Sequence, residues 1–269
     1  MPMSLRPVSR AQVFYLVDQA LYSQAQQRMF EADDSPTYQL LYLQTPYRQH
    51  AAHGPLLVLP STADAQAILA RWVEQGVAIE IHSHHPFSTL VEHWRSLTQV
   101  RRQEGPPALF RYADPRLYAG LEAALSPHEI ARLLGPAHLM HGFAAGKAWR
   151  LKLPDSQLAF SSEEFVLTMA HQRALEAWRE GVFSSRLAEE YELPEACVLT
   201  WLEQMKALAF PTEHAQWEGC RVLAEAGRRS PLSDRQMDRL GHHAYPWQQR
   251  LAQLRVLATT AHEPDEAIS

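Results

Sequence analysis

The sequence has only two cysteines, Cys197 and Cys220, among its 269 residues. No CxxC pair occurs, which excludes a cysteine-based zinc site and a CxxC redox motif. Both cysteines lie in segments with helical character, so we expect them to be buried free thiols.

Long apolar runs are also absent. A run such as Pro55–Pro60 is far shorter than the about 20 apolar residues that a membrane-spanning helix needs. The first apolar segment follows Arg6 and Arg10 but is interrupted at Asp18 and lacks a small-residue cleavage site, so we interpret it as a strand and not as a signal peptide. With 46% hydrophobic and 20% charged residues, the chain has a soluble globular composition. We expect a cytoplasmic protein without a membrane partner.

An excess of positive charge is missing as well. The formal net charge is -5, with 11 basic and 12 acidic residues through Gly146 and 14 and 18 after it. Nucleic-acid binding requires clustered lysine and arginine to neutralise phosphates. Neither half of the chain supplies them, so we expect no nucleic-acid partner.

The common catalytic motifs do not occur. No GxGxxG or GxxxxGK[ST] loop follows the first strand, and no GxSxG motif is present. The sequence therefore favours neither nucleotide binding nor nucleophilic hydrolysis. We expect a protein that is not an enzyme and that needs no cofactor.

Strands and helices alternate through the first part of the chain, between residues 11 and 153. This alternation is typical of α/β folds, and it predicts a mostly parallel or mixed sheet flanked by helices. Proline, glycine and capping residues punctuate the elements. The expected strands are 13–17, 38–43, 56–59, 77–81 and 148–153, and the expected helices are 18–31, 62–76 and 86–97.

Helical periodicity dominates the second part of the chain. Ser161–Glu164 has the composition of a helix start, and no repeat with a period of 20 to 50 residues indicates a solenoid. We expect an all-helical C-terminal lobe. The predicted division is an α/β domain at 1–155, the helical lobe at 156–261 and a disordered tail at 262–269.

The segment from Phe110 to Pro136 carries the most consistent local signals. Asp114-Pro115 ends a short strand and starts a helix, because proline disfavours the α conformation in the residue before it. Ser126 with Glu129 forms a capping box, and Gly135 ends the second helix. We expect Asp114 to accept amide hydrogens of its helix and to pair with Arg111, and Asp18 to act similarly at the first helix.

Three histidines, His82, His84 and His85, follow the strand 77–81. Imidazoles two residues apart in an extended segment point to the same side, as in a metal site. Binuclear hydrolases add an aspartate at the position where Pro86 stands. One interpretation is a metal-dependent hydrolase, and the other is a solvated loop before the helix at Pro86.

The helical lobe is rich in large aromatic side chains. Most of them are expected in its core, while some would line a surface that binds a partner, because tryptophan and tyrosine are favoured at interfaces. The candidates for partner binding are Trp178, Phe183, Trp201, Trp217, Tyr245 and Trp247.

Taken in order, several motifs resemble the type VI secretion effector adaptors, the Tap or TEC chaperones. The resemblance covers about residues 11–153 and rests most on the Arg, Asp-Pro and Gly-Pro positions. The matching motifs are Tyr15–Ala20, Leu40–Thr45, Gly54–Leu59, Phe87–Arg95, Phe110–Arg116 and Leu134–Pro136.

This resemblance implies a non-enzymatic bacterial protein that binds a toxin effector and helps to load it onto the VgrG or PAAR spike. Family members are usually encoded between the spike protein and the toxin. The α/β domain would be the common module, and the lobe would help to select the cargo. The histidine-rich loop at 82–85 departs from the family pattern. The family positions carried over are Asp18, Arg111, Asp114, Arg116 and Gly135, with an expected architectural role.

Overall fold

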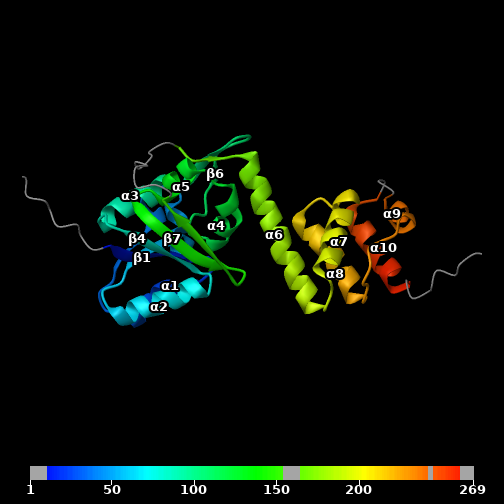
Figure 1. Ribbon diagram of the computed structural model, residues 1–269, viewed down its shortest axis with the longest axis horizontal. Helices are drawn as coiled ribbons and strands as arrows, with labels where there is room; N and C mark the ends of the chain where they lie inside the picture. The colour runs from blue at the N-terminus through cyan, green and yellow to red at the C-terminus, as the bar shows by residue number, and fades with distance from the viewer. Residues whose placement is uncertain (1–10, 154–163, 242–244, 261–269) are drawn as a thin grey trace, which may run out of the picture. The chain divides into compact units, whose positions relative to one another are not determined.

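The structure, a computed structural model, describes residues 11–153, 164–241 and 245–260. The chain divides into two compact units, Met1–Ala177 and Trp178–Ser269. The expected helix start at Ser161 and the expected tail at 262–269 lie outside the described residues. Figure 1 shows the elements of both units.

A six-stranded sheet forms the centre of the first unit, in the order β2-β3-β1-β4-β7-β8. Each of its five neighbouring pairs is antiparallel. The prediction of a mostly parallel or mixed sheet is therefore wrong. The strands are β1 (Gln12–Asp18), β2 (Thr37–Leu40), β3 (Pro55–Leu59), β4 (Ala78–Ser83), β7 (Ala137–Ala144) and β8 (Lys147–Lys152).

The error has a topological cause. Strands β3 and β4 are joined by helix α2 (Ala63–Glu74) and both pair antiparallel with β1, so they run parallel to each other. A crossover helix predicts this direction correctly. However, β1 lies between the two strands, as in a split βαβ unit, so they are not neighbours. The alternation along the sequence does not reveal the inserted strand.

Helices cover both faces of the sheet. Figure 1 shows α1 and α2 on one side and α3, α4 and α5 on the other. Under α1 and α2, Tyr15 and Trp72 belong to one buried cluster. On the opposite face, Tyr118 of α4 stacks on Trp149 of β8 with ring centroids 5.0 Å apart. The other helices that cover the two faces are α1 (Ala25–Ala32), α3 (Phe87–Ser96), α4 (Pro115–Leu121) and α5 (Pro127–Leu134).

Local sequence signals account for several element ends. The Thr62 side chain accepts a hydrogen bond from the amide of Ala65 and caps α2. Ser126 and Glu129 form the predicted capping box at α5. Strands β5 and β6 form a further hairpin, because they pair antiparallel. Short 3₁₀ helices complete the unit. These elements are β5 (Gln99–Arg102), β6 (Ala108–Leu109), η1 (Leu41–Gln44), η2 (Arg48–His53) and η3 (Glu122–Ala124).

Several local predictions are wrong. The expected strand 38–43 ends at Leu40, where the 3₁₀ helix η1 begins. Helix α1 begins at Ala25 and not at Asp18, which ends β1. Strand β7 follows Pro136, where we predicted no strand. Residues Val166–Leu167, expected in a helix, form β9 and pair parallel with β5.

The second unit contains the helices α7 to α10, and α6 spans the boundary between the units. Cys197 and Cys220 are buried free thiols, as predicted. Burial raises the pKa of both thiols. The helices are α6 (Met169–Glu190), α7 (Glu195–Ala207), α8 (Glu213–Glu225), α9 (Asp234–Leu240) and α10 (Trp247–Thr260). Among the residues that the structure describes, no helix has both the length and the apolar character needed to cross a bilayer.

A buried histidine makes the first unit sensitive to acid. The His93 ring of α3 donates from Nε2 to the carbonyl of Leu133 in α5, at 3.1 Å. Burial lowers the pKa of His93 from 6.5 to about 4.

We expect the free energy of unfolding to fall by about 2 kcal/mol between pH 7.5 and pH 5 because of His93. The pKa of the folded state lies below that of the unfolded state, so the unfolded chain binds the proton first and stability is lost as the pH drops from 6.5 toward 4. Urea unfolding at several pH values measures this slope. His93→Gln should reduce the dependence of the unfolding free energy on pH. The control His128→Gln, which changes an exposed histidine of α5, should not. An unchanged slope in His93→Gln would rule out this origin.

Candidate functional site

Asp18, the first of the positions carried over from the resemblance, connects the end of β1 to the segment after β6. Its Oδ2 accepts a hydrogen bond from Arg111 Nη2 at 2.7 Å. Its Oδ1 accepts the amide hydrogen of Ala20 at 2.9 Å. The carboxylate is buried, whereas the Arg111 side chain is 47% exposed. This contact joins residues 93 positions apart in the sequence.

Asp114 is the N-cap of α4. Its Oδ1 accepts the amide hydrogen of Arg116 at 3.1 Å, and its two oxygens accept from Arg116 Nε and Nη2 at 2.9 and 2.8 Å. Arg111 lies 3.7 Å from Asp114 and forms its shorter contact with Asp18. The expected Arg111–Asp114 hydrogen bond is therefore replaced by an Arg111–Asp18 bond, because β1 brings the second carboxylate within reach.

We expect Asp114→Ala to lower the free energy of unfolding of the first unit by about 2 kcal/mol. About half of this loss comes from the missing helix cap. The other half comes from the lost ion pair with the Arg116 guanidinium, which is partly exposed and screened by water. Asp114→Asn keeps an acceptor for the cap and should lose only about 1 kcal/mol. Urea unfolding compares the variants; equal losses in both would show that the cap contributes nothing.

Gly135 has a geometric role at the end of α5. Its φ is 56°, which favours glycine, and a Cβ placed there would collide with the His93 ring. The absence of a side chain at Gly135 lets the His93 ring of α3 pack against the end of α5. Together, Asp18, Arg111, Asp114, Arg116 and Gly135 stabilise turns and helix ends.

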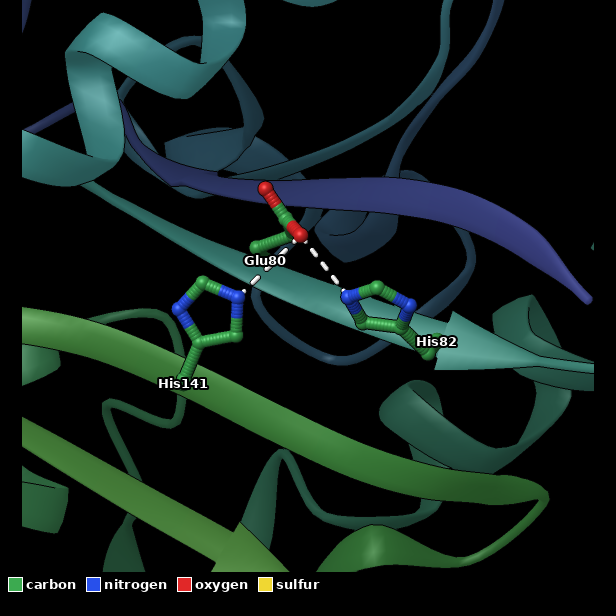
Figure 2. A group of neighbouring side chains, drawn as sticks. All are labelled: Glu80, His82 and His141. Carbon is green, nitrogen blue, oxygen red and sulfur yellow. Dashed lines mark hydrogen bonds and ion pairs between the residues drawn. The ribbon is translucent and has the colours of Figure 1, made fainter.

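A second group of polar side chains lies on the sheet face that α1 and α2 cover in part. Glu80 Oε1 is 2.7 Å from His82 Nε2 and 3.1 Å from His141 Nε2. Figure 2 shows both rings directed at this oxygen, His82 from the same strand as Glu80 and His141 from the neighbouring strand. The side chains are partly exposed, 17% for Glu80, 25% for His82 and 33% for His141. We call these three residues the Glu80 triad.

The sheet register explains why the Glu80 triad forms. Glu80 and His82 are two residues apart in β4, so both side chains point to one face. His141 of β7 is the direct cross-strand partner of Glu80. Tyr15 of β1 pairs with Glu80 on the other side, and its hydroxyl donates to Glu80 Oε2 at 3.3 Å.

The contacts of Glu80 keep its carboxylate ionised. The hydrogen bond from His141 lowers the pKa of Glu80, and burial opposes this effect without reversing it. Burial and the neighbouring Glu80 raise the pKa of the Tyr15 hydroxyl above its ordinary value of 10. An anionic oxygen therefore faces two imidazole nitrogens.

The predicted set His82, His84 and His85 is not brought together as one group. The His84 ring stacks on His138 with ring centroids 5.0 Å apart. The backbone amide of His85 donates to Ser83 Oγ, so this part of the loop forms a local turn. A cavity of about 290 Å³ is bordered by His84, His85 and His138.

Sequence reasoning missed Glu80, His138 and His141. In the structure, buried Met140 and Ala144 of β7 alternate with half-buried His141 and Phe143. The turn after β7 has positive φ at two successive residues, which is typical of a two-residue β-hairpin. With β7 recognised, a cross-strand partner for β4 would have been expected.

The aromatic candidates of the lobe fall into different environments. Trp201 and Phe183 are buried in the core, so neither is available for a partner. Trp217 stacks on Phe183 with ring centroids 4.9 Å apart, and Trp247 packs against the same cluster. Tyr245 is 44% exposed. Trp178 is half-buried.

A family model matches part of the first unit. Residues 13–132 match the family described as a domain of unknown function, DUF4123. The DUF4123 match begins in β1 and ends in α5, and so includes Asp18, Arg111, Asp114 and Arg116. This family is associated with effector adaptors of type VI secretion. Comparisons with curated proteins and with solved structures found no match.

Proposed function

We propose that this chain is a non-enzymatic adaptor chaperone of a type VI secretion system. It binds a toxin effector in the bacterial cytosol and helps to load it onto the VgrG or PAAR spike. The observation that carries the proposal is the DUF4123 match over residues 13–132, because this family is associated with effector adaptors.

The geometry of the family positions supports an architectural role for them. Asp18 and Asp114 are buried, and their oxygens accept hydrogen bonds from backbone amides and from two arginines. Such carboxylates are already satisfied and are poor candidates for acid-base catalysis. The shared part of the domain thus supplies a scaffold, and recognition lies on other surfaces.

Exposed apolar side chains in each unit supply surfaces for a protein partner. In the first unit, Phe30 and Tyr38 form an edge-to-face pair with ring centroids 5.2 Å apart, and both are more than 40% exposed. In the second unit, Leu199, Tyr245 and Val256 are exposed. Exposed aromatic and aliphatic groups bind partners by burying apolar area.

Co-expression with the product of the neighbouring toxin gene tests the proposal. A tagged chain should retain the toxin protein through affinity and size-exclusion chromatography as one complex. Phe30→Ser/Tyr38→Ser and Leu199→Ser/Val256→Ser then report which unit contacts the toxin. Ser185→Ala, a polar surface change in α6, serves as the control. Failure of the toxin protein to co-elute with the folded wild-type chain would contradict the proposal.

A further inference from the structure

We propose that the Glu80 triad, formed by Glu80, His82 and His141, binds a divalent transition-metal ion of the zinc class. This inference goes beyond the proposed adaptor function and does not depend on it. Its starting point is the donor set: one carboxylate and two imidazoles whose ligand atoms all lie within 4.8 Å of one another.

The spacing of the donors suits such an ion. Zinc lies about 2.0 to 2.2 Å from histidine nitrogen and carboxylate oxygen, so tetrahedral ligands are about 3.4 Å apart. Glu80 Oε1 is 2.7 Å from His82 Nε2 and 3.1 Å from His141 Nε2. Side-chain rotations that move these atoms by about 0.7 and 0.3 Å open the two short contacts to the distance that a shared ion requires. The two histidine nitrogens lie within 4.8 Å of each other.

The three ligands are held on rigid elements. Glu80 and His82 belong to β4, and His141 belongs to β7, which pairs with β4 in the interior of the sheet order. Metal sites need ligands that are already positioned before the ion arrives. Adjacent strands supply this positioning better than a loop does.

A further contact orients the carboxylate. Tyr15 donates to Glu80 Oε2 and so leaves Oε1 directed at the two histidines. Hydrogen bonds of this kind fix the orientation of metal-binding carboxylates and raise metal affinity. The Glu80 triad thus has both the ligands and the supporting contact of a metal site.

The donor types select the class of ion. Imidazole nitrogen favours zinc, cobalt, nickel and copper over magnesium and calcium, which prefer sets of oxygen ligands. Three protein ligands leave one tetrahedral position for water. Partial exposure of His82 and His141 gives the ion and this water access.

Metal titration of the untagged full-length chain, freed of metal with EDTA, tests the inference. We expect Co²⁺ to bind with 1:1 stoichiometry and to give the visible absorption of a four-coordinate site. Zn²⁺ should displace Co²⁺, and Mg²⁺ and Ca²⁺ should not. A lack of saturable Co²⁺ and Zn²⁺ binding by the folded wild-type chain would overturn the inference.

Variants assign the binding to these residues. His82→Gln, His141→Gln and Glu80→Gln should each weaken Zn²⁺ binding by more than about tenfold. His128→Gln and His214→Gln change exposed histidines elsewhere and should bind as the wild type does. Unchanged Zn²⁺ affinity in a folded His82→Gln/His141→Gln double variant would overturn the assignment.

A second measurement needs no variant. X-ray absorption of the zinc-loaded wild-type chain should show two imidazole ligands and oxygen ligands at about 2.0 to 2.2 Å. Circular dichroism in EDTA shows whether each variant is folded. Where a variant is not folded, the X-ray absorption of the wild-type chain tests whether the zinc ligands include two histidines. A coordination shell without two imidazoles would contradict the proposed site.

Discussion

Replacing Gly135 by alanine is expected to lower the free energy of unfolding of the first unit by about 3 kcal/mol. Two costs add at this position. A non-glycine residue with positive φ costs about 1 to 2 kcal/mol, and forcing a methyl group into a filled space costs about 1 to 3 kcal/mol. The φ of Gly135 is 56°, and its added Cβ would meet the buried His93 ring.

Gly146→Ala is the matched control for Gly135→Ala. Gly146 also has positive φ, at 72°, but a Cβ added there meets nothing within 4 Å. Its replacement should therefore cost only about 1 kcal/mol. Hydrogen exchange of the full-length chain, followed in peptides of β4 and β7, measures both losses. Equal losses in the two variants would contradict the packing of His93 against Gly135.

Replacing Trp201 by alanine is expected to destabilise the second unit by about 3 to 5 kcal/mol, as for other large buried aromatic residues. The Trp201 side chain has no exposed surface. Its Nε1 donates to the carbonyl of Ser230 at 3.0 Å, so truncation also leaves that acceptor without its partner. Hydrogen exchange in α7 and α8 of the full-length chain reports the loss.

Tyr245→Ala is the control for Trp201→Ala. The Tyr245 side chain is 44% exposed, and its removal should change stability by less than about 0.5 kcal/mol. Under the proposed function, a change at Tyr245 affects effector binding without unfolding the lobe. A Trp201→Ala variant as stable as the wild type, but unable to bind effector, would show that Trp201 is a contact residue and not core.

Signals that depend on a few neighbouring residues predicted the structure well. Ser126 and Glu129 form the capping box because both partners lie within one turn of helix. Asp114 caps α4 for the same local reason. Thr62 does so at α2. Each of these contacts is fixed by residue type and spacing alone.

Contacts between residues far apart in the sequence were less predictable. The insertion of β1 between β3 and β4 depends on how strands pair across 37 or more residues, which the alternation of strands and helices does not encode. The choice of partner for Arg111 has the same origin. Asp114 is three residues away in sequence, but β1 places Asp18 closer in space.

The candidate metal site was predicted from the sequence only in part. The position of His82 at the end of a strand was predicted, and it belongs to the Glu80 triad. Its partners were not predicted, because Glu80 looked like an ordinary strand residue and His141 lies in the strand that the sequence analysis missed. Only the antiparallel pairing of β4 with β7 brings Glu80 opposite His141.

Secretion by the bacterium itself tests the adaptor account most directly. The toxin effector and VgrG that the proposed function requires are followed in the culture supernatant of a wild-type strain, a strain lacking this gene and a complemented strain. The account predicts that deletion abolishes toxin secretion, that VgrG secretion continues, and that complementation restores the toxin. Undiminished secretion of the toxin from the deletion strain would contradict the account.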